Sequence, residues 1–285
     1  MNNQNNPKRG GLILVGTPIG NLSDISPRAL DALRECDFIA AEDTRVTLKL
    51  LNRYEIKKPL VCYYQHNMAE RGEELCARML AGETCCLVTD AGMPAISDPG
   101  ELLVAQCVRA GTPVGCVPGP SAVVTALAVS GLPTGRFTFE GFLSVKRPSR
   151  RRHLEDIMNE QRTMVFYEAP HKLLPTLRDL HETLGDRRVA IVRELTKIHE
   201  EVIRTTLGEA VVMQRAAPLK GEIVLVVEGA PPPAKQAMAL PEAAEEARAL
   251  MEDGMSRTDA AREAARISGH KKGDIYKLIS TDNVE

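Results

Sequence analysis

Five apolar segments in the first half of the chain each end in residues that could bind a small polar ligand. These residues are GTPIGN (16–21), EDTR (42–45), QHN (65–67), DAGMPAISDPG (90–100) and PGPSA (118–122). The fourth motif uses eleven residues, although a loop that only connects two elements needs about 2–6. In the fifth, Gly119, Pro120 and Ser121 would place free N–H groups and a hydroxyl at a helix start, which suits a carboxylate or a close backbone approach. The five motifs together indicate an enzyme with a cleft for a small polar ligand.

Several common site motifs are absent from the sequence. GTPIGN has GxxxG spacing and a turn stiffened by Pro18, so it does not match the dinucleotide fingerprint, in which Asp43 would have been the ribose-binding acid. No Gly-Lys-Ser/Thr follows it, as a Walker A loop requires, and no GxSxG nucleophile motif occurs. The six histidines show no HExxH or other metal-binding spacing, so we expect no metal site.

The periodicity of the first half predicts alternating strands and helices. Apolar runs predict strands at 11–15, 37–42, 59–64, 84–89 and 112–117. Segments with helical spacing follow them at 26–36, 44–54, 69–80, 101–110 and 121–131. Such alternation is typical of a parallel sheet covered on both faces, and ligands bind at the carboxyl ends of its strands.

The second half predicts a mixed α/β domain and a helical end. Strands are expected at 136–142, 163–168, 188–195, 200–206 and 221–229, and helices at about 149–160, 170–184 and 207–216. The third and fourth of these strands are too close for a crossover helix and should form a hairpin. We therefore expect a disordered tail over 1–10, α/β domains over 11–118 and 119–230, a proline-rich linker over 231–241, and a helical domain resembling a helix-turn-helix over 242–285.

Composition and charge limit which partners the protein could bind and in which cell compartment it could work. A net charge of −2 excludes a globally basic nucleic-acid-binding protein, but the loop VKRPSRRRH (145–153) and the pair Lys271 and Lys272 are locally basic. Candidate RNA contacts are therefore Lys146, Arg147, Arg150, Arg151, Arg152, Lys271 and Lys272, with a merely solvated loop as the alternative. The first ten residues lack the apolar segment of a signal peptide, and no apolar run is long enough to span a membrane.

The cysteines point to a reducing compartment. There are seven, none in a CxxC pair, and six lie in or beside apolar runs, which is typical of reduced, buried thiols. These six are Cys36, Cys62, Cys85, Cys86, Cys107 and Cys116. We therefore expect a cytoplasmic protein without a membrane partner.

The ordered motifs GTPIGNLSDIS, AEDTR, DAGMPAISDPG, VPGPSA, FYEAPHK and RELTKIHEE resemble the tetrapyrrole methylase superfamily of S-adenosylmethionine enzymes, the class III methyltransferases, over about residues 11–229. The resemblance implies two α/β domains with the cofactor in a cleft between them, and a homodimer. The most similar subfamily methylates the ribose 2′-oxygen of a cytidine in the decoding region of 16S ribosomal RNA. The C-terminal helices of this chain also resemble that subfamily's helix-turn-helix.

The resemblance also implies how the cofactor is held. The loop after the fourth strand would wrap S-adenosylmethionine with its backbone, and Met93 stands where relatives carry an acidic residue, which leaves the backbone role intact. The implied cofactor-binding residues are Pro18, Ile19, Asp90, Gly92, Met93, Ile96, Ser121, Ala122, Tyr167, Leu195 and Gly221.

The resemblance leaves Glu42, Asp43, Arg45 and His66 free for catalysis beside the cofactor loop. Methyl transfer to a ribose hydroxyl needs a proton acceptor, which could be His66 or one of the two carboxylates, and Arg45 could hold a phosphate. Lys220 is a further candidate. His66 is slightly favoured because neutral imidazole accepts a proton well near pH 7, whereas Asp43 could also be only a helix cap or an ion-pair partner.

Two other functions are compatible with these motifs. One is a methyltransferase acting on a precorrin-type tetrapyrrole, and the other is a non-catalytic nucleic-acid-binding regulator whose cleft senses a nucleotide. The basic loop and the helical C-terminal region favour an RNA substrate over a small macrocycle.

Overall fold

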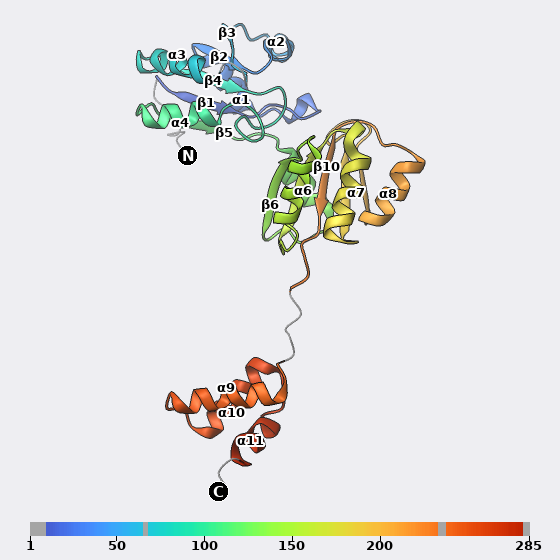
Figure 1. The fold of residues 1–285 in the computed structure, drawn as a ribbon. Coiled ribbons are helices and arrows are strands. Elements are labelled where there is room, and N and C mark those ends of the chain that lie inside the picture. The colour runs from blue at the N-terminus through green and yellow to red at the C-terminus, as the bar shows by residue number, and fades with distance from the viewer. Residues whose placement is uncertain (1–9, 65–67, 233–237, 282–285) are drawn as a thin grey trace. The chain divides into compact units, whose positions relative to one another are not determined.

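The computed structural model describes residues 10–64, 68–232 and 238–281 (Figure 1). The chain divides into two compact units, Met1–Ala230 and Pro231–Glu285. Within these described residues, the first unit contains two five-stranded sheets with their helices, and the second contains three helices. This architecture is α/β with a helical C-terminal unit.

The first sheet is entirely parallel, as the alternation of strands and helices predicted. Its order is β3-β2-β4-β1-β5, and its strands are β1 (Leu12–Val15), β2 (Phe38–Ala41), β3 (Leu60–Cys62), β4 (Cys85–Val88) and β5 (Val114–Val117). The connecting segments contain η1 (Leu22–Asp24), α1 (Pro27–Glu35), α2 (Thr44–Arg53), α3 (Met68–Leu80) and α4 (Glu101–Arg109). Each helix follows a strand and returns the chain to the start of the next, so the carboxyl ends of all five strands meet at one edge.

Both faces of the first sheet are buried. On one face, side chains of β1 and β2 pack with Ala29 and Leu33 of α1 and Leu51 of α2. On the other, side chains of the same sheet pack with Leu75 of α3 and Leu103 of α4. This confirms the expected two-sided covering and explains why the central strands are nearly continuous apolar runs.

None of the seven cysteines, all of which lie within the described residues, forms a disulfide. Two of them are less buried than predicted, because Cys62 is half-buried and Cys116 is exposed. Both lie on the edge strands β3 and β5, where neighbouring elements cover less of the sheet than at its centre.

The second sheet is mixed, with the order β6-β7-β10-β8-β9. Its strands are β6 (Phe137–Phe142), β7 (Thr163–Glu168), β8 (Arg188–Arg193), β9 (Glu201–Thr206) and β10 (Ile223–Val227). Only β6 and β7 pair in parallel, and the antiparallel pairing of β8 with β9 confirms the predicted hairpin. Its helices are α5 (Ala122–Ser130), α6 (Arg147–Asp156), α7 (Leu173–Leu184) and α8 (Leu207–Ala216), with the short η2 (Pro170–Lys172) before α7.

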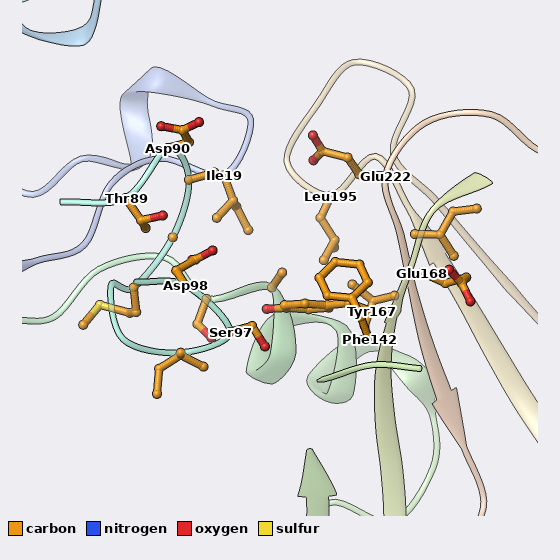
Figure 2. Close-up of a pocket in the computed structure, with 18 of the residues that line it drawn as sticks. Ile19, Thr89, Asp90, Ser97, Asp98, Phe142, Tyr167, Glu168, Leu195 and Glu222 are labelled. Carbon is orange, nitrogen blue, oxygen red and sulfur yellow. The ribbon is translucent and has the colours of Figure 1, made fainter. Parts of the chain in front are cut away.

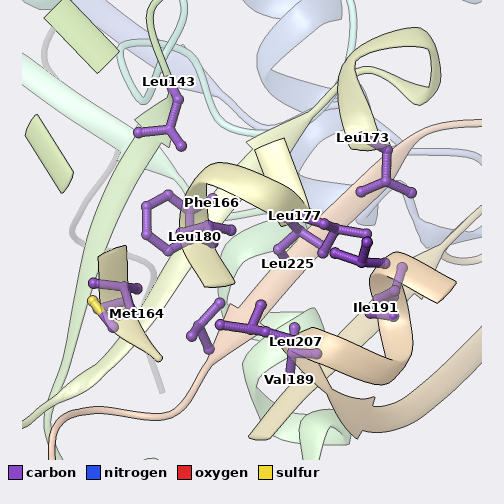
Figure 3. Close-up of a cluster of buried hydrophobic side chains, with 14 of the residues drawn as sticks. Leu143, Met164, Phe166, Leu173, Leu177, Leu180, Val189, Ile191, Leu207 and Leu225 are labelled. Atoms are coloured by element: carbon purple, nitrogen blue, oxygen red, sulfur yellow. The ribbon is translucent and has the colours of Figure 1, made fainter. Parts of the chain in front are cut away.

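The two faces of the second sheet pack against different helices. Alternate residues such as Phe166 and Leu225 pack with Leu154 of α6 and Leu177 of α7 in the larger cluster (Figure 3). Residues of the opposite parity pack with Val123, Ala126 and Leu127 of α5. Because side chains alternate along a strand, helices α6 and α7 cover one face and α5 covers the other.

The C-terminal unit consists of α9 (Leu240–Glu252), α10 (Arg257–Ser268) and α11 (Lys272–Thr281). Its core is made mainly of alanines, Ala243, Ala244 and Ala247 of α9 with Ala260, Ala261 and Ala264 of α10, closed by Ile275 and Ile279. Small side chains let the helices approach closely. Helix α9 begins at Leu240, two residues before the predicted start of the helical domain, and Pro241 occupies an early position that suits proline.

None of the helices within the described residues is both long and apolar enough to cross a membrane.

Candidate active site

The loops after β1 and β4 lie side by side at the carboxyl edge of the first sheet. Strands β1 and β4 are neighbours, yet the chain continues to α1 on one face of the sheet and to α4 on the other. Such a point in an open α/β sheet is where ligands bind. Thr17 and Gly92 join the two loops through backbone hydrogen bonds of 2.9 and 3.1 Å, and the Thr17 hydroxyl donates to the Thr89 carbonyl oxygen at 3.2 Å.

The loop from Asp90 to Gly100 has an unusual backbone. Gly92 has a φ of +90°, and two residues with side chains, Ala95 and Ser97, have φ values of +68° and +62°. Residues other than glycine rarely adopt positive φ, and such strain concentrates at ligand-binding sites. The length and composition of this loop therefore allow a backbone shape in which several of its residues line a cavity.

A cavity of about 480 Å³ lies beside this loop and is lined by loops that follow strands of the first sheet and by residues of the second sheet (Figure 2). Its size falls within the range of about 300–1,000 Å³ typical of small-molecule sites. Polar residues of the first half, among them Glu42, Thr89, Asp90, Ser97 and Asp98, form one wall. The second half contributes mainly apolar groups, including Phe142, Tyr167, Val192, Leu195 and Val224.

The apolar wall is ordered by packing among its own residues. The ring of Tyr167 lies 5.0 Å from that of Phe139 and 5.4 Å from that of Phe142. Burial, with a smaller effect of Asp98, raises the pKa of Tyr167 to about 12. Tyr167 therefore stays neutral and presents an aromatic face and a hydroxyl.

Leu195 lies between two residues with positive φ, Glu194 at +51° and Thr196 at +65°. The Glu194 carboxylate holds this turn, because it accepts hydrogen bonds from the Glu222 N–H at 2.8 Å and from Lys197 Nζ at 3.0 Å. Gly221 gives the carboxylate room, since a Cβ there would lie 2.4 Å from Glu194 Oε1.

The polar wall contains an acid with a perturbed pKa. Burial raises the pKa of Asp98 to about 6, and the negative charges of Glu42 and Asp90 add to this effect, while a hydrogen bond with Thr89 opposes it. Glu42 Oε2 accepts a hydrogen bond from the Thr89 hydroxyl at 2.9 Å. Burial also raises the pKa of Asp90, whose Oδ1 accepts the Asp43 N–H at 3.2 Å.

Asp43 and Arg45 form an exposed pair beside this wall. Asp43 caps α2 by accepting the Arg45 N–H at 2.8 Å, and its two oxygens accept Arg45 Nε at 3.0 Å and Nη2 at 2.6 Å. These bonds lower the pKa of Asp43 to about 2. The Arg45 side chain is 86% exposed, so Asp43 fixes a guanidinium that faces solvent.

The cavity brings together ten of the residues singled out in the sequence. These are Ile19, Glu42, Asp90, Gly92, Met93, Ile96, Ser121, Ala122, Tyr167 and Leu195. Pro18, Asp43, Arg45, Lys220 and Gly221 are not among the lining residues, and His66 lies outside the described residues. The Lys220 carbonyl oxygen accepts Arg193 Nε at 3.0 Å, and Gly221 acts on the cavity only by making room for Glu194.

Sequence reasoning missed several lining residues. Thr89, Asp98 and Phe142 were not singled out, nor were Glu168 and Glu222. Asp98 lies within the quoted motif DAGMPAISDPG, where a second acid ahead of a proline was the available signal. Among the described residues, no group of three or more His, Cys, Asp or Glu side chains is arranged to hold a metal ion.

The basic segment 145–153 was expected as a loop that runs into a helix at about 149–160, but most of it is helical, because α6 already begins at Arg147 and continues to Asp156. Pro148 is compatible with the first turn of a helix, and Leu154 anchors the helix in the core. Arg150 pairs with Asp179 of α7 at 2.5 Å, with the two side chains only 14% and 19% exposed. Its guanidinium is therefore occupied, whereas Lys146, Arg147, Arg151 and Arg152 are exposed.

In the C-terminal unit, Lys271 is exposed in the turn between α10 and α11. Lys272 is half-buried at the start of α11.

Comparison with known proteins agrees with this geometry. The family model of Tetrapyrrole (Corrin/Porphyrin) Methylases matches residues 11–211. A protein named Ribosomal RNA small subunit methyltransferase I from Synechocystis is 45% identical over 94% of this chain and 97% of its own length. The protein of the same name from Thermotoga maritima is 51% identical over 77% of this chain and 99% of its own.

A solved structure of uroporphyrin-III C-methyltransferase from Thermus thermophilus, complexed with S-adenosyl homocysteine, shares the fold. Its TM-score is 0.52 at 20% identity, over 77% of this chain and 97% of that one. The paired sheets, the cavity at their junction and the match over residues 11–211 lead to one conclusion: the chain belongs to the tetrapyrrole methylase family and is a methyltransferase.

Proposed function

We propose that this protein is an S-adenosylmethionine-dependent methyltransferase that methylates the ribose 2′-oxygen of a cytidine in the decoding region of 16S ribosomal RNA. The observation that carries this proposal is the 45% identity, over 94% of the chain, to a relative named Ribosomal RNA small subunit methyltransferase I. We further propose that it acts as a cytoplasmic homodimer on the assembled small subunit.

The lining of the cavity fits S-adenosylmethionine. A Cβ at Gly92 would lie 3.4 Å from Ile19 Cγ2, another lining residue, so the glycine keeps space for a ligand against the backbone. The acidic wall complements a positively charged ligand, and the apolar wall around Tyr167 and Leu195 suits a flat ring. When bound, S-adenosylmethionine supplies an electrophilic methyl group on a positively charged sulfur.

The residues of the chain would then position the target nucleotide. Asp43 holds the Arg45 guanidinium by two hydrogen bonds, and the remaining N–H groups of Arg45 are free to meet a phosphate from solvent. Asp43 itself is a poor proton acceptor, because its pKa is about 2. Of the candidate bases named from the sequence, Glu42 is the one in the cavity lining, and His66 stays a prediction.

Contacts with the rest of the RNA are expected on the exposed cations. Arg147, Arg151 and Arg152 on α6 and Lys146 before it face solvent. In the C-terminal unit, Lys271 precedes α11 and Lys272 begins it, and helix-turn-helix proteins contact nucleic acid with the N-terminal residues of the second helix of the motif. We expect phosphate contacts here, because lysine and arginine neutralise the backbone without reading sequence.

The function can be tested with methyl-labelled S-adenosylmethionine and three substrates: small ribosomal subunits, free 16S ribosomal RNA and a precorrin-type tetrapyrrole. We expect label in the RNA of intact subunits, in a nucleotide whose 3′ linkage resists alkaline cleavage because its 2′-oxygen is blocked. Label in the tetrapyrrole and not in RNA would overturn the proposed substrate. Label on a base rather than a ribose would overturn the proposed target atom.

A further inference from the structure

Two carboxyl groups lie near one hydroxyl on the polar wall of the cavity. Thr89 Oγ1 donates to Glu42 Oε2 at 2.9 Å, and Thr89 is also near enough to Asp98 to lower the pKa of that acid. A threonine hydroxyl has only one proton to donate. When both acids are ionised, Thr89 can donate to only one of them. If Asp98 were protonated, it could donate a hydrogen bond to the Thr89 hydroxyl while Thr89 donates to Glu42. The three side chains can therefore hold one additional proton, on Asp98.

The surroundings of Asp98 raise its pKa toward neutral pH, so that it can take up this proton there. The charged groups that act on it are both acids, Glu42 at the end of β2 and Asp90 at the start of the same loop. From the second sheet it is faced by Tyr167 of β7, whose own pKa it helps to raise. Burial is the largest cause of the raised pKa of Asp98, at about 6. A base with a pKa close to the working pH is well matched to proton transfer.

The other acids lining the cavity on the second sheet are engaged. Glu168 accepts the Ala169 N–H at 2.7 Å and the Thr176 hydroxyl. Glu222 pairs with Lys197 at 3.1 Å. In Figure 2, by contrast, the Asp98 carboxyl lies between the loop after β4 and the second-sheet residue Tyr167.

We propose that Asp98 is the general base of methyl transfer and that Thr89 links it to Glu42. The inference rests on the proposed function. The 2′-O–H bond breaks and its proton goes to an Asp98 oxygen, while the 2′-oxygen forms a bond to the donor methyl carbon. The bond from that carbon to sulfur breaks, and its electron pair stays on sulfur. Asp98 then releases its proton to water.

Asp98→Asn tests the role because it keeps the shape and removes the base. Single-turnover rates on small ribosomal subunits should fall about 10²-fold or more, while calorimetric affinities for S-adenosylmethionine and S-adenosyl homocysteine stay within about threefold. The wild-type rate should rise with pH through an apparent pKa near 6, and Thr89→Val should move that value upward because a bond that lowers it is lost. Asp31→Asn, an exposed acid on α1, is the charge-matched control and should behave as wild type.

A second readout does not depend on turnover. With ¹³C-labelled aspartate, one carboxyl signal of the wild type should titrate near pH 6 and be missing in Asp98→Asn. If Asp98→Asn fails to fold, two measurements still test the role of Asp98. One is the wild-type titration, and the other is the rate of Asp98→Glu, which keeps a carboxyl group and should retain measurable activity. The absence of any aspartate signal titrating near pH 6 would overturn the proposal.

Two kinetic results would also overturn it. One is an Asp98→Asn rate within threefold of wild type. The other is a loss of affinity for S-adenosylmethionine but not for S-adenosyl homocysteine, whose sulfur carries no charge, at an unchanged saturated rate. That result would make Asp98 a counter-charge to sulfur. Failure of the proposed function is distinguishable, because the wild type would then transfer no methyl group to RNA, whatever Asp98→Asn does.

Discussion

The two sheets of the first unit have five strands each, yet they contribute opposite chemistry to the same cavity. The parallel sheet ends all its strands at one edge, so its loops bring acids and a strained backbone together there. The mixed sheet offers a flat face, and its residues Tyr167, Val192 and Val224 line the cavity as an apolar surface. The acids with raised pKa values, Asp90 and Asp98, thus lie on the loops of the first sheet, whereas most of the lining from the second sheet is apolar.

The second sheet also differs in what it carries on its other face. Helix α6, with its exposed arginines, packs on the face opposite α5. A small ligand and a polyanion would therefore meet different faces of one sheet. Strand direction decides where the loops of a sheet converge, and hence which sheet can gather charged loop residues at one edge.

The largest expected effect is on the strained loop of the first sheet. Gly92→Val places a β-branched side chain at a φ of +90° and against Ile19, which also lines the cavity. We expect a loss of affinity for S-adenosylmethionine of roughly 10–100-fold, measured by calorimetry.

Gly111→Val is the matched control for this change. Gly111 also has a positive φ, +70°, but no atom lies near a Cβ there. Both variants should lose roughly 1–3 kcal/mol of stability from backbone strain, and only Gly92→Val should lose affinity. Equal affinities in the two variants would mean that this loop does not hold the cofactor by its backbone.

A smaller effect concerns protein stability, which should depend on pH in opposite directions for two acids of the first half, Asp98 and Asp43. The pKa of Asp98 is raised to about 6, above the usual value of about 3.9. The folded state therefore binds the extra proton between pH 4 and 6, and stability falls as pH rises through this window. Asp98→Asn should raise the free energy of unfolding by about 1–3 kcal/mol at pH 8 and not at pH 3.5, as measured by urea unfolding.

Asp43 should show the reverse, because its pKa is lowered to about 2. Its contribution to stability is present above pH 4 and is lost as pH falls toward 2. Asp43→Asn should therefore destabilise the protein at pH 8 and have little effect at pH 2. The same sign for both acids would contradict the distinction between Asp98, whose pKa is raised by burial, and Asp43, whose pKa is lowered by its pairing with Arg45.

The smallest effect concerns RNA affinity and the arginines of α6, the helix on the face of the second sheet opposite α5. Replacing Arg151 and Arg152 with alanine should reduce the slope of log affinity for RNA against log salt by up to about 1.4–1.8, at about 0.7–0.9 per lost contact. Arg150→Ala should leave that slope unchanged and cost about 1–3 kcal/mol of stability, because it strands the half-buried Asp179. An unchanged slope in the double variant would mean that these arginines are only solvated.

The sequence alone determined the elements whose signals are local. Short apolar runs alternating with amphipathic segments determined the parallel first sheet, and the short spacing between the runs at 188–195 and 200–206 determined the β8–β9 hairpin. The motif at 90–100 also identified the loop that borders the cavity, because its glycines and prolines report backbone shape directly.

Only the tertiary structure decided which acids differ in chemistry. Asp43 and Asp98 are the same residue type in neighbouring motifs, yet one pKa is about 2 and the other about 6. Asp43 is paired with a residue two positions away, while the state of Asp98 depends on Glu42 and on Thr89, which distant parts of the chain bring to it. In the same way, Arg150 met Asp179 through the packing of α6 on α7. Burial and long-range neighbours set these properties, and neither is encoded in local spacing.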